Sequence, residues 1–208
     1  MIAVIDYGAG NLRSIQRALQ RLDCETQIID TPRALDAAQS LVVPGDGAFG
    51  PAMVRLRAAG FPERIRAFVD SGRPFLGICL GMQLLFEESE EGGLHPGLGV
   101  LPGRVIRLSG TVKVPHMGWN TLRFVRPSPL FAGCATGMHV YFIHSYQARP
   151  GDPALVAATA NHGAEVAAVV GRDNIWATQF HPEKSGAGGM QMLGNFVRWA
   201  VGAGAAGR

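Results

Sequence analysis

Short apolar runs alternate with helix-like segments before about residue 92. Between residues 12 and 22 the apolar positions recur every three or four residues, which predicts a helix that packs one face on a sheet. The apolar runs predict short strands at residues 2–6, 26–30, 41–43 and 75–78. This order of elements favours an α/β fold with a central, mostly parallel sheet that helices cover on both faces.

The pattern changes after residue 92. Glycines and prolines, Gly110 among them, punctuate short β-rich pieces up to residue 125. Further strands are expected at residues 138–143, 155–160, 166–170 and 175–180, followed by a helix whose apolar positions are 190, 193 and 197. We therefore expect one domain over residues 1–208, with a β-rich antiparallel portion in its second half and a frayed tail at 202–208.

A cysteine stands between two glycines where the strand at 75–78 ends. Gly77 and Gly81 allow the strand and the amphipathic helix predicted after it to approach closely, so that the Cys79 thiol projects from a sharp turn. This G-x-C-x-G pattern predicts a nucleophilic cysteine. The alternative is a small buried cysteine in a core strand, which is common for free cysteines.

A nucleophilic thiol needs a base, and the base needs a group that orients it. His181 and Glu183 follow the apolar run at 175–180, and Pro182 favours an extended backbone at His181. Both side chains can then leave the strand end in the same direction, with Glu183 fixing the tautomer of the imidazole. The triplet alone also fits a surface loop, but together with Cys79 it predicts a Cys-His-Glu triad.

Two of these motifs resemble those of a known family, the class I (triad) glutamine amidotransferases: the elbow at residues 77–83 and Phe-His-Pro-Glu at 180–183. Three further runs, at 6–11, 115–120 and 141–146, are similar to the glutaminase subunits of imidazole glycerol phosphate synthase, an enzyme of histidine biosynthesis. The resemblance spans nearly the whole chain. It implies a flavodoxin-like glutaminase fold that hydrolyses glutamine through a thioester on Cys79, without a cofactor.

The resemblance also implies where the oxyanion of the reaction is stabilised. The backbone N–H groups of Asp46 and Leu80 would form the oxyanion hole. Asp46 departs from the family, in which this position is usually apolar, and only a carboxylate that points away from the oxyanion fits the role. Without the resemblance, the loop at 44–49 is an ordinary turn between a strand and a helix.

Binding residues follow from the resemblance as well. The residues implied to hold glutamine are Gly45, Gln83, Glu91, Ser145 and Tyr146. Glu91 ends a run of acidic residues at 87–91, any one of which also fits a solvated helix end.

The resemblance implies a separate (β/α)8 cyclase subunit as the partner in a heterodimer. That subunit would use the released ammonia to make imidazole glycerol phosphate and aminoimidazole carboxamide ribotide, and a chain of 208 residues has no room for such a barrel. The residues expected to face the partner are Asn11, Trp119, Asn120, Tyr141 and Lys184.

Composition removes several other classes of function. The net charge is only +3 and the cations are scattered, so nucleic-acid binding is not expected. No apolar run is long enough to span a membrane and no basic leader precedes the first strand, which favours a cytoplasmic protein. The three cysteines lie far apart, which indicates neither a disulfide framework nor a metal site.

Some motifs have a structural interpretation. Gly8 and Gly10 follow a strand, but Arg13 stands where a dinucleotide-binding motif has its third glycine, so a tight turn is favoured. His116 and His144 are expected to be structural histidines. Three competing functions remain: a glutaminase subunit of another synthase, a cysteine peptidase built on a similar elbow, and an inactive binding module with this fold.

Overall fold

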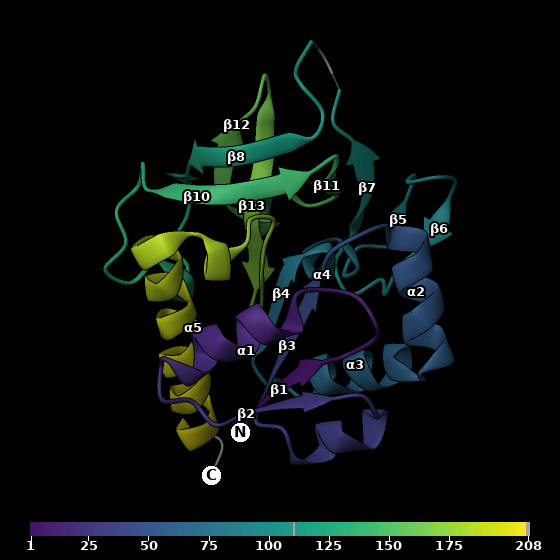
Figure 1. The fold of residues 1–208 in the computed structure, drawn as a ribbon, viewed down its shortest axis with the longest axis vertical. Helices are drawn as coiled ribbons and strands as arrows, with labels where there is room; N and C mark the ends of the chain where they lie inside the picture. The colour runs from purple at the N-terminus through teal and green to yellow at the C-terminus, as the bar shows by residue number, and fades with distance from the viewer. Residues whose placement is uncertain (110, 207–208) are drawn as a thin grey trace.

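The computed structural model describes residues 1–109 and 111–206. Its main sheet has eight strands in the order β2-β1-β3-β4-β14-β13-β12-β9 (Figure 1). In chain order these strands are β1 (Ile2–Ile5), β2 (Thr26–Ile29), β3 (Ser40–Gly45), β4 (Phe75–Cys79), β9 (Arg123–Phe124), β12 (Val156–Asn161), β13 (Glu165–Arg172) and β14 (Ile175–Thr178). The strands from β2 to β14 in that order pair in parallel and the rest pair antiparallel, which confirms the predicted α/β sheet.

Helices cover both faces of the parallel part (Figure 1). One face carries α1 (Leu12–Gln20) and α5 (Gly186–Ala206), and the other carries α2 (Phe49–Ala58) and α3 (Phe61–Asp70). Side chains alternate along each strand, so β1 sends Ile2 and Val4 into the core under α1 and α5, and Ala3 and Ile5 into the other core. This explains why the central strands read as continuous apolar runs.

The second half adds two smaller sheets. A four-stranded sheet has the order β11-β7-β5-β6, and a two-stranded ribbon pairs β8 with β10. Their bounds are β5 (Glu88–Ser89), β6 (His95–Pro96), β7 (Gly103–Arg107), β8 (His116–Thr121), β10 (His139–His144) and β11 (Tyr146–Pro150). All these pairs are antiparallel except that of β5 with β7, so the predicted antiparallel portion is present with one exception.

Short helices complete the chain. The 3-10 helices are η1 (Pro32–Ala37), η2 (Pro129–Phe131), η3 (Pro153–Leu155) and η4 (Pro182–Lys184). The elbow leads into α4 (Leu80–Gln83), which is a single turn with all four residues buried. The amphipathic helix predicted there is therefore wrong, because this turn lies inside the core between β3, β4 and β11 and has no solvent face.

Two other boundaries differ from the sequence prediction. The first helix ends at Gln20, so Leu22 lies in the turn that follows it. α5 continues to Ala206, while 207–208 and Gly110 lie outside the described residues. Fraying of the tail concerns motion and stays a prediction.

Candidate active site

Cys79 occupies a sharp turn between β4 and α4. Its backbone has φ 55° and ψ −109°, a conformation that residues with a side chain rarely adopt. A Cβ at Gly77 would lie 2.7 Å from the carbonyl oxygen of Gly81, and a Cβ at Gly81 would collide with the carbonyl oxygen of Val43. Both glycines are therefore required for the turn, as the G-x-C-x-G pattern predicts.

The end of β14 brings His181 and Glu183 to the same edge of the sheet. β14 pairs in parallel with β4, and parallel strands end side by side. His181 Nδ1 lies 2.8 Å from Glu183 Oε1, and the two side chains are 5% and 1% exposed. Because the carboxylate accepts this hydrogen bond, Nδ1 carries the proton and Nε2 is left to face the nucleophile.

The resting structure does not join the thiol to the imidazole. His181 Nε2 is buried and makes no hydrogen bond to any described residue. The Cys79 thiol donates to the Ile143 carbonyl oxygen at 3.9 Å, and Gln179 Nε2 donates to the sulfur at 3.8 Å. Catalytic hydrogen bonds are commonly made only when substrate binds.

Two opposing effects act on the pKa of His181. Burial lowers it, because a charged imidazolium is poorly solvated there. The neighbouring Cys79 and Glu183 raise it more strongly, so the pKa of His181 rises to about 10. The ring therefore holds a proton readily, and the protonated ring is the form needed to protonate a departing ammonia.

A cavity of about 200 Å³ joins these groups. It is lined by Cys79 and His181 together with Asp46, Leu80, Gln83, Glu91, Ser145 and Tyr146, all of which were implicated from the sequence. Gly45 is buried against Tyr7 and Leu80 and does not line the cavity, so its role in binding stays a prediction.

Two side chains in the cavity are held by other parts of the chain. Gln83 Nε2 donates to the Tyr146 carbonyl oxygen at 2.9 Å and to Gln179 Oε1 at 3.0 Å, which leaves its own Oε1 as an acceptor. Glu91 Oε2 accepts from the N–H of Phe49 at 2.8 Å, at the start of α2. Both groups are therefore positioned before any ligand binds.

The loop after β3 is fixed by the loop after β1. Asp46 Oδ1 accepts from the N–H of Gly10 at 2.9 Å, so its carboxylate is directed at that neighbouring loop. Tyr7 Oη donates to the Pro44 carbonyl oxygen at 3.0 Å, and burial above all raises the pKa of Tyr7, which keeps the phenol protonated. Asp46 thus has the outward orientation that an oxyanion role requires.

Residues 3–199 match the family model of class-I glutamine amidotransferases. The chain belongs to this family. An imidazole glycerol phosphate synthase subunit HisH from Syntrophotalea carbinolica is 52% identical over 203 residues, which cover 94% of this chain and 98% of the relative. The HisH subunit of Geobacillus kaustophilus is 52% identical over 210 residues, covering 98% and 99%.

Solved structures agree on the fold of this amidotransferase. A crystal structure of a glutamine amidotransferase superposes with a TM-score of 0.77 at 23% identity and covers 97% of this chain and 100% of its own. The PurLQS structure from Thermotoga maritima gives a TM-score of 0.75 at 19% identity, with 95% and 97% coverage. At these identities the likeness concerns the fold alone.

The ribbon of β8 and β10 presents an apolar face next to the amidotransferase cavity. Trp119 lies opposite Tyr141 and Met117 lies opposite Ile143, so the four side chains share one face. Met117 and Trp119 are 61% and 57% exposed, and the rings of Trp119 and Tyr141 meet edge to face at 6.1 Å. We call these four residues the apolar ribbon face.

The other residues expected at an interface are placed differently. Asn11 is exposed and caps α1 by accepting from the N–H of Ser14 at 3.3 Å, and Lys184 is exposed at the cavity rim. Asn120 lies on the opposite face of the ribbon from Trp119, because side chains alternate along β8. Its amide bonds to groups of this chain, so its expected contact with a partner stays a prediction.

Sequence reasoning missed Gln179 and the apolar partners of Trp119. Gln179 is fully buried and bridges Gln83 to the Cys79 sulfur. Its signal was a polar residue at the end of an otherwise apolar run. Met117 and Ile143 could have been found because each stands two residues from Trp119 or Tyr141, and side chains two residues apart on a strand share one face.

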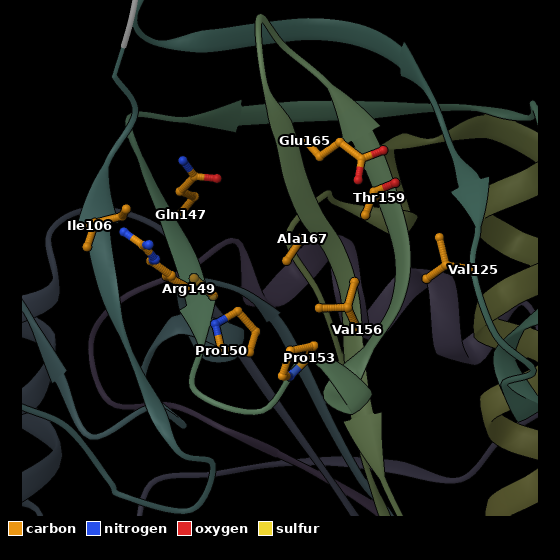
Figure 2. A pocket seen from close by; sticks show the side chains of 11 residues that line it. Ile106, Val125, Gln147, Arg149, Pro150, Pro153, Val156, Thr159, Glu165 and Ala167 are labelled. Carbon is orange, nitrogen blue, oxygen red and sulfur yellow. The ribbon is translucent and has the colours of Figure 1, made fainter.

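A larger cavity lies elsewhere in the amidotransferase. It measures about 510 Å³ and lies between β11 and the pair β12–β13, with Pro150, Val156 and Ala167 among its lining (Figure 2). No cysteine or histidine lines it. Cavity size alone would therefore point away from the cysteine and histidine of the triad.

Residues 1–109 and 111–206 contain no cluster of three or more His, Cys, Asp or Glu side chains able to hold a metal ion. Over the same residues no helix is long and apolar enough to cross a membrane. Cys24, Cys79 and Cys134 are free thiols.

Proposed function

We propose that this chain is the glutaminase subunit of an imidazole glycerol phosphate synthase in histidine biosynthesis. It hydrolyses glutamine to glutamate and ammonia. The observation that carries the proposal is that Cys79 and His181 line one small cavity, with His181 bonded to the buried Glu183, in a chain 52% identical to named synthase subunits.

The side chains of the cavity support a two-step reaction. Cys79 gives its thiol proton to His181, Sγ attacks the carboxamide carbon, the C–N bond breaks, and His181 passes the proton to the departing ammonia. Water then attacks the glutamyl thioester while neutral His181 takes a proton from it, which releases glutamate and restores the thiol. Glu183 holds the imidazole through Nδ1 in both steps.

The oxyanion formed in each step is assigned to the backbone N–H groups of Asp46 and Leu80, which belong to residues that line the cavity. For glutamine itself, Gln83 Oε1 and the Glu91 carboxylate are acceptors suited to the α-ammonium group. Ser145, Tyr146 and Gly45 complete the proposed binding set.

The proposed partner is a separate (β/α)8 cyclase that receives ammonia and makes imidazole glycerol phosphate and aminoimidazole carboxamide ribotide. The apolar ribbon face supports a docked protein, because four such side chains side by side are unusual on a free surface. It adjoins the cavity through Ile143, which places a bound partner beside the site where ammonia is released.

Three free thiols fit a reducing compartment, and we propose the cytoplasm.

The decisive test is hydrolysis of free glutamine by the purified chain, alone and with the cyclase and its ribotide substrate. We expect weak hydrolysis alone, strong hydrolysis in the loaded complex, and ammonia transfer into the ring product. Stimulation by a different synthase would favour another glutaminase subunit. Cleavage of peptides, or no hydrolysis under any condition, would favour the peptidase or the binding module.

Lys184 offers a separate test of the partner. Its ammonium group stands at the cavity rim, where a partner carboxylate could pair with it. Lys184→Ala should weaken the stimulation by the cyclase more than it lowers the stability of the chain. Unchanged partner affinity together with unchanged stimulation would contradict an interface role for Lys184.

A further inference from the structure

His144 connects the ribbon to the wall of the proposed glutamine pocket. It ends β10, is buried, and lines the cavity that contains Cys79. Its Nδ1 lies 2.9 Å from the carbonyl oxygen of Tyr146. A carbonyl oxygen can only accept, so Nδ1 carries the hydrogen and Nε2 of the neutral ring is an acceptor.

The His116 ring, which is next to His144, also donates from Nδ1 and accepts at Nε2. His116 Nδ1 lies 2.9 Å from His144 Nε2, so His116 donates from Nδ1. Its Nε2 then accepts, and the group facing it at 3.1 Å is the Asn120 amide nitrogen. The carbonyl of Tyr146 thereby fixes the tautomers of both histidines.

The far end of the chain of hydrogen bonds gives the same answer independently. Asn120 Oδ1 accepts from the N–H of Thr121 at 2.8 Å, and Nδ2 donates to the Asn161 carbonyl oxygen at 2.8 Å. The amide is therefore oriented with its nitrogen toward His116. Donation runs in one direction throughout, from Asn120 to His116, to His144, to the Tyr146 oxygen.

Packing holds the rings in this arrangement. His116 is stacked between Phe142 at 4.5 Å and His162 at 4.1 Å, measured between ring centroids. Burial lowers the pKa of His116 and that of His144 to about 4, so both rings are neutral near pH 7. An imidazolium at either position would have to place a second donor against a donor.

We propose that His144 and His116 are positioning residues for the glutamine pocket, acting through the Tyr146 carbonyl. That oxygen accepts from both His144 Nδ1 and Gln83 Nε2, so its place fixes the Gln83 amide and leaves Gln83 Oε1 directed to the ligand. The proposal rests on the proposed function only in taking glutamine as the ligand. The order of donors and acceptors itself does not depend on it.

The first experiment reads the tautomers of the wild-type chain. Nitrogen NMR of the histidine rings at pH 7 should show hydrogen on Nδ1, and none on Nε2, for His116 and His144. His162 is the internal contrast, because its Nε2 lies 2.8 Å from the Lys113 carbonyl oxygen and must carry hydrogen. Hydrogen on Nε2 of His116 or His144 would overturn the proposal.

A variant of Asn120, the first donor in the chain of hydrogen bonds, tests the same assignment. Asn120→Asp replaces the amide donor by an acceptor of the same shape. We expect hydrogen to appear on Nε2 of His116, by a change of tautomer or of charge. An unchanged His116 signal in a folded Asn120→Asp variant would overturn the assigned direction.

The second experiment measures glutamine hydrolysis in the stimulated complex. His144→Phe should raise the KM for glutamine about tenfold, with a much smaller change in kcat, because it removes one donor to the Tyr146 oxygen. His144→Asn keeps a donor at the Nδ1 position and should stay within about threefold of wild type. His162→Phe, which keeps the stack on His116 and lies outside the chain of hydrogen bonds, is the matched control.

The arms separate the two proposals. An unchanged KM in His144→Phe, or equal KM values in His144→Phe and His144→Asn, would overturn the positioning role. A wild-type complex that hydrolyses no glutamine would instead defeat the proposed function, while the NMR arm still decides the tautomers.

Discussion

The protein contains two buried histidine sites that burial alone would make alike. At the end of β14, the pKa of His181 is raised to about 10, whereas under the ribbon the pKa values of His116 and His144 are lowered to about 4. Burial lowers the pKa in all three. The difference lies in the neighbours: His181 faces a carboxylate and a thiol, while the ribbon histidines face a carbonyl, an amide and each other.

The comparison distinguishes a histidine suited to acid and base catalysis from histidines with a structural role. An imidazole beside anionic groups can hold and return a proton at neutral pH, which suits an acid and base. An imidazole among neutral partners keeps one tautomer and acts as a fixed connector. The same residue type therefore serves two purposes in one protein, and the charges within hydrogen-bond reach decide which.

The strongest test of this contrast removes the nucleophile or base of the first site. Cys79→Ala and His181→Ala should each lower glutamine-dependent synthesis by the complex by about 10⁴-fold or more, while ammonia-dependent synthesis continues, because the triad lies wholly in this chain. Steady-state assays with glutamine and with ammonia measure both activities. His116→Asn, at the second site, should lose far less.

The double variant of these two positions provides a further check. Residues that act as a unit do not lose activity additively, so Cys79→Ala/His181→Ala should resemble either single variant. A much lower activity in the double variant, or loss of ammonia-dependent synthesis in the single variants, would contradict a triad confined to this chain.

The next effect concerns the carboxylate that distinguishes the two sites. Glu183→Gln keeps the shape but removes the charge 2.8 Å from His181 Nδ1, so we expect the pKa of His181 to fall and activity to drop by roughly 10²–10⁴-fold. NMR titration of the imidazole measures the first and steady-state kinetics the second. An unchanged pKa of His181 would show that Glu183 does not create the contrast.

A smaller effect appears in stability against pH. The folded pKa of His116 and His144, about 4, lies below the ordinary 6.5, so their contribution is present above pH 6.5 and is lost as pH falls through about 4. We expect this pair to account for on the order of several kcal/mol of the free energy of unfolding over that range, since each unit of pKa shift is worth about 1.4 kcal/mol. Urea unfolding of wild type and of His116→Asn/His144→Asn measures it, and parallel pH profiles would contradict it.

The contribution of His181 to stability depends on pH in the opposite direction. The folded pKa of His181 is raised above 6.5, so its contribution is complete below that pH and is lost as pH rises through about 10. The two sites thus favour opposite ends of the pH scale.

Much of the fold could be predicted because its signals are local. The strands from β1 to β4 and from β12 to β14 read as apolar runs, and the elbow reads from two glycines around one cysteine. The length of α4 could not be read, since its end depends on where β11 and the second sheet pack against it. A long apolar stretch looks the same whether it makes one turn or three.

The triad motif was visible in the sequence, but the state of the site was not. The hydrogen bond of Asp46 to Gly10 and the chain through His116 and His144 join residues far apart in the sequence. Their donors and acceptors are fixed only by the folded geometry. Sequence patterns could give the residue types and not the direction of the bonds.

The smallest effect is expected at Asp46, whose hydrogen bond holds the loop after β3 in place. Asp46→Val removes the acceptor 2.9 Å from the N–H of Gly10, which frees the loop that carries the proposed oxyanion donor. Basal hydrolysis by the isolated chain should rise by about fivefold, the worth of one hydrogen bond, and stimulation by the partner should shrink. Asp46→Asn keeps an acceptor and should behave like wild type.

Steady-state hydrolysis by each form, alone and in the loaded complex, measures this change. If Asp46→Val leaves both the basal rate and the stimulation unchanged, Asp46 is a passive loop residue.

The pairing of β4 with β14 has a consequence for the order in which the site comes into being. The two strands are neighbours in the sheet, yet Cys79 leaves the ribosome long before His181 and Glu183 are synthesised. Domains generally fold as units, and the growing chain carries its nucleophile without a base for about half of its synthesis. We expect a nascent chain to be unable to release ammonia until its last strand has inserted next to β4.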